Sequence, residues 1–272
     1  MASEMPFEIM GILNVTPDSF SDGGLYLDTN AAIDHALKMA HDGADVIDVG
    51  GESSRPYAVP VPLDVELDRV IPVITRLKKE GVNRISIDTV KPQVAQRAVD
   101  CGATLINDIS AKLCEVAAKN KVGWVAMHML GDPTVMQTDP KYDDVVSEVK
   151  DFLISAANKA TKLGVEEIWI DPGFGFGKRV NDNVKLLNAI SEFQQSGLWV
   201  LVGLSRKSFL GRIGKLESSS LDDNLISVDK RKSASVAAAM YSVLQGAKMV
   251  RVHDVLETYQ AFRLLYELNR VN

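Results

Sequence analysis

Short apolar segments alternate along the chain with longer segments whose apolar residues recur at helical spacing. The short runs are typical of buried strands, and the longer periodic runs are typical of amphipathic helices. The predicted strands cover residues 9–13, 45–49, 84–87, 104–106, 124–127, 167–170, 198–202 and 249–252. The predicted helices cover residues 31–43, 62–80, 92–101, 113–119, 143–163, 181–195, 230–244 and 255–268. Alternation of this kind predicts a parallel sheet with crossover helices.

The predicted strands are nearly continuous apolar runs, as expected where both faces of a sheet are covered. The chain has 272 residues, and a (β/α)8 barrel needs roughly 250. No internal repeat or interdomain linker interrupts the alternation, and the polar segment 217–227 predicts a loop before the seventh helix. We therefore predict an α/β fold, a (β/α)8 TIM barrel that forms a single domain over residues 1–272.

Most of the predicted strands end in, or are followed by, a polar or ionisable residue. These residues are Asn14, Asp88, Asn107, His128, Asp171, Arg251 and His253. In a barrel the strand ends converge on the C-terminal face, where TIM-barrel active sites lie. One polar residue at a strand end is usually a loop residue, but a set of this size predicts a ligand site.

Composition narrows the kind of ligand. The formal net charge is −6, so we expect neither nucleic acid nor an anionic membrane as a partner. Any anionic substrate must therefore meet a local concentration of positive charge. The two cysteines, Cys101 and Cys114, predict free thiols rather than a disulfide framework. No apolar run approaches the ~20 residues of a membrane span, and residues 1–10 do not resemble a signal peptide, so we expect a cytoplasmic protein.

Two loops follow the first two strands. Residues 14–24 form a long, turn-rich loop, and loops of this length are usually functional or disordered. Residues 50–56 begin with paired glycines, and Pro56 restricts Arg55 to an extended conformation. The alternative for the second loop is a surface turn with a solvated arginine.

The segment 171–178 contains three glycines but is not a P-loop. It is one residue too short, and Arg179 stands where a P-loop needs Ser or Thr. Asp171 instead predicts a rim carboxylate that accepts two parallel N–H bonds from an amidine-like edge, such as that of a pterin. Asp88 could do the same, and Asn107 can both donate and accept. The alternative is that each strand-end Asp caps the following helix.

Basic residues follow the last two strands. Arg206 and Lys207 lie after the seventh strand, and Arg251 and His253 end the eighth. TIM barrels commonly bind phosphate there, so we predict an anion site; the alternative is a set of surface charges paired with nearby acids.

The remaining histidines and tryptophans have simpler interpretations. His128 has no second His or Cys at ligand spacing, so a packed or hydrogen-bonded histidine is expected rather than a zinc ligand. The tryptophans, Trp124, Trp169 and Trp199, are expected in the core or against helices. His35 and His41 are expected to be exposed.

Together these segments resemble the dihydropteroate synthase family. The resemblance rests on residues 11–24, 50–56, 87–89, 106–109, 127–129, 171–178, 205–209 and 251–254, in this order, and runs from about residue 8 to the C-terminus. It implies an enzyme that condenses 6-hydroxymethyl-7,8-dihydropterin pyrophosphate with p-aminobenzoate. The products would be 7,8-dihydropteroate and pyrophosphate, in folate biosynthesis.

The resemblance also implies roles for individual residues. The catalytic residues would be Arg55, Lys207, Arg251, His253 and Asp22. The pterin and pyrophosphate would contact Asn14, Ser54, Asp88, Asn107, Asp171, Lys207, Arg251 and His253. The p-aminobenzoate site would contain Phe20, Arg55, Pro56, Phe176, Lys207 and Ser208. Asn14 would also contact Mg2+, the chain would be a homodimer, and it would be a sulfonamide target.

The chain departs from the family pattern in places. Ser54 stands where threonine is usual, which keeps the hydroxyl, and Tyr57 stands where glycine is usual, which puts sulfonamide sensitivity in doubt. The stretch between Ile109 and Trp124 is shorter than usual. One alternative is a methyltetrahydrofolate methyltransferase-like barrel, which would have no use for Arg55 or residues 205–209. The others are a non-catalytic pterin-binding homologue and a purely structural barrel.

Overall fold

The computed structural model describes residues 5–16, 25–53, 59–131, 136, 139–214 and 226–270. Six residues singled out by the sequence therefore lie outside the described residues. They are Phe20 and Asp22 in the first loop and Ser54, Arg55, Pro56 and Tyr57 in the second.

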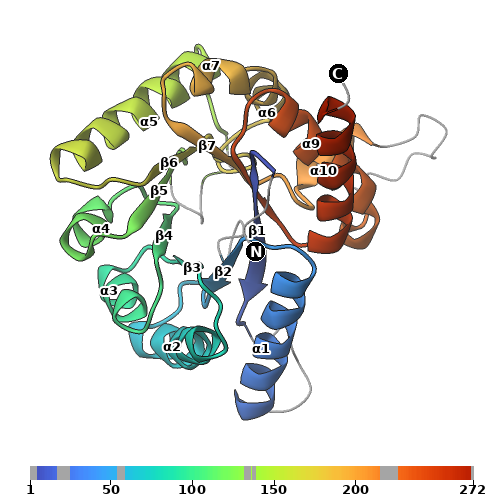
Figure 1. Cartoon of the computed structure of the whole chain (residues 1–272). Helices are drawn as coiled ribbons and strands as arrows, with labels where there is room; N and C mark the ends of the chain where they lie inside the picture. Colours follow the sequence, from blue (N-terminus) through green and yellow to red (C-terminus); the bar gives the residue numbers. More distant parts are fainter. Residues whose placement is uncertain are drawn as a thin grey trace.

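The strands form a closed parallel barrel in the order β1-β2-β3-β4-β5-β6-β7-β8, as predicted. Figure 1 shows this barrel inside a ring of helices that follows the sequence around it. The strands are β1 (Glu8–Asn14), β2 (Val46–Gly50), β3 (Ile85–Asp88), β4 (Leu105–Asp108), β5 (Gly123–Met127), β6 (Ile168–Asp171), β7 (Trp199–Val202) and β8 (Met249–Val252). The expected (β/α)8 architecture is confirmed.

The helices cover the outside of the barrel. They are α1 (Leu25–His41), α2 (Leu63–Lys79), α3 (Pro92–Asp100), α4 (Cys114–Asn120), α5 (Val145–Lys162), α6 (Val180–Asn188), α7 (Ile190–Gln194), α8 (Ser208–Ile213), η2 (Val228–Arg231), α9 (Lys232–Leu244) and α10 (Val255–Arg270). Three details differ from the sequence prediction. Helix α1 begins six residues earlier, a break at Ala189 separates α6 from α7, and the short α8 was not predicted.

Two apolar layers hold the barrel together. Inward-facing side chains fill its interior: Met10, Val46, Leu105, Val125, Trp169, Leu201 and Met249. A larger layer lies between the strands and the helices. Helix α2 shows how the sequence builds this second layer, because its buried residues Val70, Val73, Ile74 and Leu77 recur at helical spacing.

Strand alternation decides which polar residues face the barrel interior. At the end of β4, Asn107 points inward, and its neighbour Asp108 points outward. The buried Asp108 accepts hydrogen bonds from the N–H groups of Lys112 and Leu113 at 2.7 and 2.6 Å and from Nε1 of Trp124 at 3.1 Å. Asp108 therefore stabilises the turn before α4, whereas the side chain of Asn107 lies inside the barrel at its C-terminal end.

The tryptophan prediction is partly wrong. Trp124 and Trp169 are buried, but the side chain of Trp199 is 48% exposed at the N-terminal end of β7. Its ring lies 5.0 Å from that of Trp169, so it covers the lower end of the barrel from outside. His35 and His41 are exposed as predicted. Both cysteines are free thiols, Cys114 buried and Cys101 partly buried.

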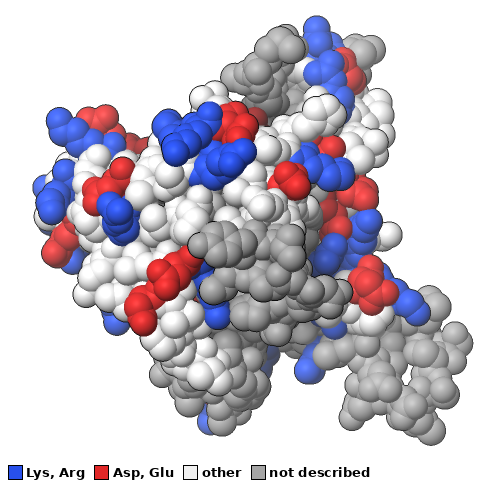
Figure 2. Space-filling model, turned by 90° about the horizontal axis from the view of Figure 1, so that it is seen from below, with Lys and Arg blue, Asp and Glu red and all other residues white. Residues whose placement is uncertain are grey.

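The surface matches the modest net charge. On the face seen in Figure 2, the basic and acidic side chains of the described residues are interspersed rather than gathered into one field. No helix in the described part of the chain is long and apolar enough to cross a bilayer.

Candidate active site

A buried polar cluster occupies the barrel interior at the C-terminal ends of the strands. Arg251 donates from Nε to Oδ2 of Asp48 at 2.6 Å and from Nη2 to Oδ2 of Asp88 at 2.8 Å. Nδ2 of Asn107 donates to the same Asp48 oxygen at 3.0 Å. The cluster therefore joins β2, β3, β4 and β8 across the barrel.

Strand register explains why these residues meet. Gly50 pairs with both Asn14 and Asp88, and Asp88 pairs with Asn107. A Cβ atom on Gly50 would lie 3.5 Å from Cβ of Asp88 and 3.9 Å from Oδ1 of Asn14. Glycine at this position therefore leaves open space between Asn14 and Asp88, at the rim.

Asp48 is a site residue that the sequence analysis missed. It lies within an apolar strand, where it was counted only as part of the strand. The available signal was a carboxylate two residues before Gly50, hence on the same face of the strand as the rim position. Its Oδ1 atom is buried and has no hydrogen-bond partner among the described residues. The carboxylate thus orients Arg251 and Asn107 through one oxygen.

Asp171 is held at the rim by the turn that follows it. Its Oδ1 atom accepts a hydrogen bond from the N–H of Gly173 at 2.7 Å. Gly173 has φ +70°, and a Cβ atom there would lie 1.9 Å from the carbonyl oxygen of His128. Only glycine fits this left-handed, crowded position. The Oδ2 atom lies beside Gly203, where a Cβ would be 3.7 Å away.

Lys207 stands between the carboxylates and an aromatic ring. Its Nζ atom lies 4.1 Å from the ring centroid of the buried Phe176, a cation–π distance. Burial lowers the pKa of Lys207 to about 8, although the carboxylates of Asp171 and Asp88 oppose the shift. The structure thus brings together two residues that were assigned to the p-aminobenzoate site.

Burial also perturbs the carboxyl groups of the cluster. It raises the pKa of Asp88 to about 7, against the opposing effect of Arg251 and with a further contribution from Asp48. One guanidinium serves two buried carboxylates, so neither is fully compensated. Burial raises the pKa of Asp171 as well. Strongly perturbed groups gathered at one strand-end rim are typical of an active site.

His128 is packed and hydrogen-bonded, as predicted. Nζ of the buried Lys178 lies 3.0 Å from its Nδ1 atom and donates to the carbonyls of His128 and Phe176 at 3.2 and 3.0 Å. Burial, followed by the charge of Lys178, lowers the pKa of His128 to about 3. The imidazole is therefore a neutral acceptor for Lys178, and the pair fixes the loop after β6.

His253 is a neutral group at the same rim. Oγ of Ser205 accepts a hydrogen bond from the backbone N–H of His253 at 3.2 Å and lies 3.0 Å from Nδ1 of the His253 ring. Burial and then the nearby Arg251 lower the pKa of His253 to about 3.

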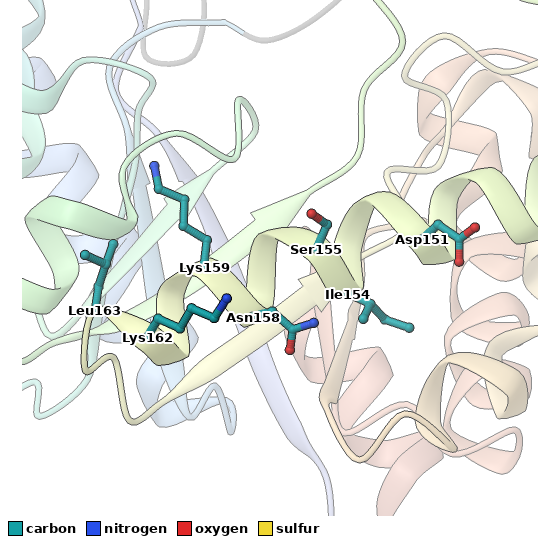
Figure 3. Close-up of a pocket in the computed structure, with 7 residues that line it drawn as sticks. All are labelled: Asp151, Ile154, Ser155, Asn158, Lys159, Lys162 and Leu163. Carbon is teal, nitrogen blue, oxygen red and sulfur yellow. The ribbon is translucent and has the colours of Figure 1, made fainter.

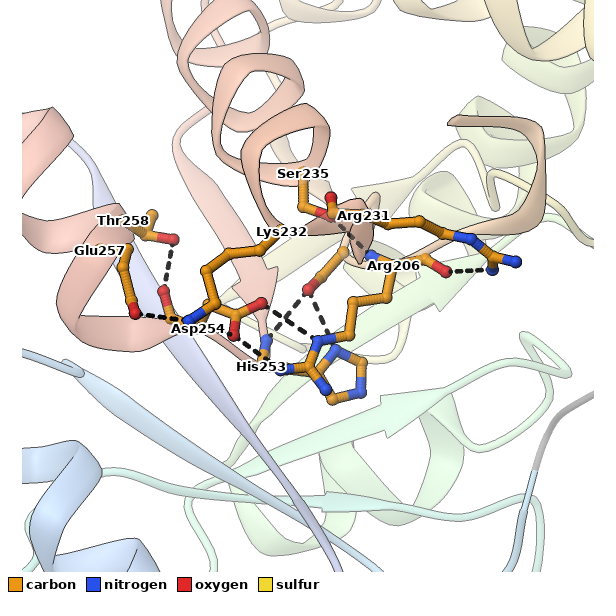
Figure 4. A network of polar contacts seen from close by, with 9 residues as sticks. Arg206, Arg231, Lys232, Ser235, His253, Asp254, Glu257 and Thr258 are labelled. Carbon is orange, nitrogen blue, oxygen red and sulfur yellow. Dashed lines mark hydrogen bonds and ion pairs between the residues drawn. The ribbon is translucent and has the colours of Figure 1, made fainter. Parts of the chain in front are cut away.

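Arg206 does not join the predicted anion site. It makes a two-pronged ion pair with Asp254, with Nη2–Oδ1 and Nε–Oδ2 distances of 2.6 and 3.1 Å (Figure 4). For this residue the alternative interpretation, pairing with a nearby acid, is correct. Lys207 and Arg251, by contrast, lie against the carboxylates of the cluster.

Two further predicted residues, Asn14 and Ser208, also lie at the rim. Asn14 is half-buried at the end of β1, and its carboxamide oxygen faces the space beside Gly50. Ser208 is exposed and begins α8. The described residues contain no group of three or more His, Cys, Asp or Glu that could hold a metal ion. Mg2+ needs only one or two protein oxygens when substrate phosphates and water supply the others, and Asn14 offers such an oxygen.

A separate surface hollow of about 560 Å³ lies on α5, and none of the candidate-site residues described above lines it. Figure 3 shows that its lining residues come from that helix, among them Asp151, Asn158 and Lys162, and from Leu163 directly after it. No strand-end residue contributes to it, so it is not the candidate active site.

Comparison with known proteins agrees with this geometry. Residues 10–253 match the family described as pterin binding enzyme. The chain belongs to this family. Dihydropteroate synthase of Escherichia coli K12 is 43% identical over 263 residues, which cover 94% of this chain and 90% of that protein.

Solved structures extend the comparison. Dihydropteroate synthase of Xanthomonas albilineans with 4-aminobenzoic acid is 42% identical, with a TM-score of 0.86 over 96% of this chain and 93% of that chain. The same enzyme in complex with 7,8-dihydropteroate is 40% identical, with a TM-score of 0.83 over the same shares.

Proposed function

We propose that this chain is an enzyme of folate biosynthesis with dihydropteroate synthase activity. It condenses 6-hydroxymethyl-7,8-dihydropterin pyrophosphate with p-aminobenzoate to give 7,8-dihydropteroate and pyrophosphate. The observation that carries this proposal is the cluster of the buried Asp88, Asn107 and Asp171 with the partly buried Lys207 and Arg251, at the strand ends of a barrel of this family. The near-complete similarity to dihydropteroate synthases supports it.

In this proposal the cluster binds the pterin ring. A pterin presents ring N–H and amine donors next to carbonyl and ring-nitrogen acceptors. Asp171 and Asp88 accept from the donor edges, and Asn107 and Lys207 serve the remaining atoms. Because the polar groups are buried, a ring lacking one of these donors leaves a carboxylate unpaired, which makes the site selective.

The second group of residues serves the leaving pyrophosphate. Arg251 supplies positive charge, while His253 is neutral in the free chain and would contact the pyrophosphate through its imidazole ring. Asn14 would hold Mg2+ together with the substrate oxygens, and the ion would neutralise charge on the leaving group. Stabilisation of the departing anion is then the main catalytic contribution of this side of the rim.

The chemistry needs no strong general base. Pyrophosphate leaves from the methylene carbon beside the pterin ring, and the ring stabilises positive charge on that carbon. The arylamine nitrogen is neutral near pH 7, so it needs only correct placement. Phe176, with Lys207 stacked on its ring, would form one side of the p-aminobenzoate site, and Ser208 at the start of α8 would form another.

A turnover assay tests the activity. The protein is mixed with the pterin pyrophosphate, p-aminobenzoate and Mg2+, dihydropteroate is measured by chromatography, and pyrophosphate by a coupled readout. We expect product only when all three components are present and none with Arg55→Ala, which should still bind pterin. Equal loss of turnover and pterin affinity in Arg55→Ala would remove its proposed role. Pterin binding without any product from the unaltered chain would indicate a non-catalytic homologue.

We also propose a homodimer formed through the last two helices. Leu244 on α9 and Leu264 and Leu268 on α10 are 62%, 59% and 58% exposed. Leu264 and Leu268 are four residues apart and so lie on one face of α10. Sedimentation should give a dimer that Leu264→Lys weakens; a monomer at micromolar concentration would contradict the proposal.

Two remaining proposals concern inhibition and location. Because a sulfonamide carries the same arylamine group as p-aminobenzoate, it should compete for that site, and Tyr57→Gly should change its potency. A dose–response curve of the sulfonamide in the turnover assay, recorded for the unaltered chain and for Tyr57→Gly, measures the inhibition and the change in potency. We place the chain in the cytoplasm, which cell fractionation tests.

A further inference from the structure

Arg206 immediately precedes Lys207, yet its side chain turns away from the cluster. It bonds Asp254 through both Nε and Nη2, at 3.1 and 2.6 Å. Asp254 in turn immediately follows His253. The ion pair therefore ties the segment after β7 to the end of β8 (Figure 4). Each segment carries one residue of the candidate site.

The backbone of Arg206 is held from both sides. Its N–H donates to Oγ of Ser235 at 2.8 Å, and its carbonyl accepts from Nη1 of Arg231 at 3.0 Å. Arg231 is buried, and its Nε donates to the carbonyl of Ile226 at 2.7 Å. These bonds come from the start of α9 and the turn before it, so a third segment joins the arrangement.

The conformation of Arg206 also needs support. Its φ is +58°, in the left-handed region that side chains other than glycine, Asn and Asp rarely adopt. Such a conformation persists only where surrounding contacts determine it, and it is often found at functional sites. The two-pronged ion pair and the two backbone bonds are those contacts. They turn the chain so that Lys207 faces Phe176 while Arg206 faces Asp254.

We propose that Arg206 and Asp254 form a positioning pair that sets the separation between Lys207, at the pterin and p-aminobenzoate sites, and His253, at the pyrophosphate site. The role rests on the proposed function. Bond breaking and amine attack take place at the same carbon, so the groups that serve the leaving pyrophosphate and those that serve the incoming amine must keep a fixed spacing. Ser205 and His253 form a second link between the segment after β7 and the end of β8, and this link also holds the two segments at a fixed separation.

A variant of Lys232 distinguishes a positioning role of the Arg206–Asp254 pair from a simple effect of positive charge near Asp254. Its Nζ lies 2.7 Å from Oε1 of Glu257 and 3.9 Å from Oδ1 of Asp254, so it belongs to the same charged cluster. It differs from Arg206 in bonding Glu257 at the surface. Lys232→Gln therefore removes a positive charge near Asp254 while leaving the fork of Arg206 intact, which makes it a matched control.

The experiment compares Arg206→Asn with Lys232→Gln in the full chain. Asn tolerates the left-handed conformation, so the turn should form without the ion pair. We expect kcat/KM for the pterin pyrophosphate to fall on the order of 10- to 100-fold in Arg206→Asn, as for a small misplacement of reacting groups. Lys232→Gln should stay within about twofold, as usual for a surface change. Affinity for the pterin alone, measured by calorimetry, should fall much less than kcat/KM, because the positions of Asp88, Asn107 and Asp171 do not depend on Arg206.

Further variants guard the interpretation. Arg206→Lys keeps the charge but not the fork, and it should show a smaller loss of the same kind; it carries the test if Arg206→Asn does not fold by circular dichroism. Asp254→Asn combined with Arg206→Asn should lose less than the sum of the single changes, since both remove one interaction. Additive losses would contradict the pair.

Two outcomes overturn the proposal. One is wild-type turnover in Arg206→Asn, and the other is an equal loss in Lys232→Gln, which would mean that charge alone matters. An unaltered chain that neither turns over nor binds inorganic pyrophosphate would instead reject the proposed function, and the positioning role with it. Turnover of the unaltered chain in the same assay thus separates the two failures.

Discussion

The barrel carries an arginine between two carboxylates at each of its two mouths. At the N-terminal mouth, Arg84 lies 2.6 Å from Glu8 and 2.6 Å from Glu167. At the C-terminal mouth, Arg251 lies 2.6 Å from Asp48 and 2.8 Å from Asp88. The residue types and distances are alike, but the surroundings differ.

Burial is the main difference. The side chains of Arg84, Glu8 and Glu167 are 30%, 34% and 32% exposed, so water reaches part of each side chain. Asp48 and Asp88 are 0% and 10% exposed. Solvated pairs contribute little to stability, whereas a buried carboxylate depends on its partner. The comparison indicates that the N-terminal mouth closes the barrel and that the C-terminal mouth holds uncompensated charge for a ligand.

The largest expected effect comes from Arg251→Met. It leaves two buried carboxylates without their shared partner, so the free energy of unfolding should fall by about 3–5 kcal/mol. Urea denaturation measures this loss, and turnover should disappear with it. A loss below about 1 kcal/mol, in the range of a surface pair, would show that the two mouths are energetically equivalent.

Asp171→Asn should weaken pterin binding with less effect on folding. The amide can no longer accept both N–H bonds, and an unpaired buried donor costs roughly 1–3 kcal/mol. Calorimetry with 6-hydroxymethyl-7,8-dihydropterin gives the change in affinity. Asp151→Asn, on the outer face of α5, is the matched control. Unchanged affinity in Asp171→Asn would place the pterin elsewhere.

The pKa of Asp88 predicts a pH effect on stability. Between its ordinary 3.8 and about 7, the folded chain holds a proton there that the unfolded chain has lost. Stability contributed by this group therefore falls as pH rises through that window. From about pH 5 to about pH 7, the chain should lose about 1–2 kcal/mol relative to Asp88→Asn. Urea denaturation at both pH values tests this, with the exposed Asp34→Asn expected to parallel the unaltered chain.

The smallest effect belongs to Arg84→Met. Its two ion pairs are solvated, so the free energy of unfolding should change by about 1 kcal/mol or less. Turnover should stay unchanged, because this mouth lies at the opposite end of the barrel from the strand-end cluster. Thermal denaturation and the turnover assay measure the two. A large loss of activity would contradict the inference that the N-terminal mouth has a structural role and that only the C-terminal mouth takes part in catalysis.

Much of the fold could be predicted because local patterns encode it. Apolar runs and helical spacing located all eight strands and gave their order around the barrel. Helix ends were less predictable: neither the break at Ala189 nor the start of α1 at Leu25 was found from the spacing of apolar residues. Trp199 was expected in the core or against helices, but its place at the N-terminal end of β7 leaves it exposed.

The candidate site was predicted in its members but not in its connections. Strand ends pointed to Asn14, Asp88, Asn107, Asp171 and Arg251. In the structure Arg251 bonds Asp88 directly, and one further residue, Asp48, links Arg251 to Asn107. That residue was missed because a carboxylate inside an apolar strand gives no sign of what lies across the barrel.

By itself, the sequence determined the strand–helix alternation and the polar residues at the strand ends, because both follow from spacing over a few neighbouring positions. Only the tertiary structure decided the partners of the two arginines. Arg251 faces inward because strand alternation and barrel closure place it opposite Asp48 and Asp88. Arg206 faces Asp254 because its left-handed turn and its bonds to the start of α9 aim it away. Such pairings join residues far apart in sequence, and closure of the barrel fixes them.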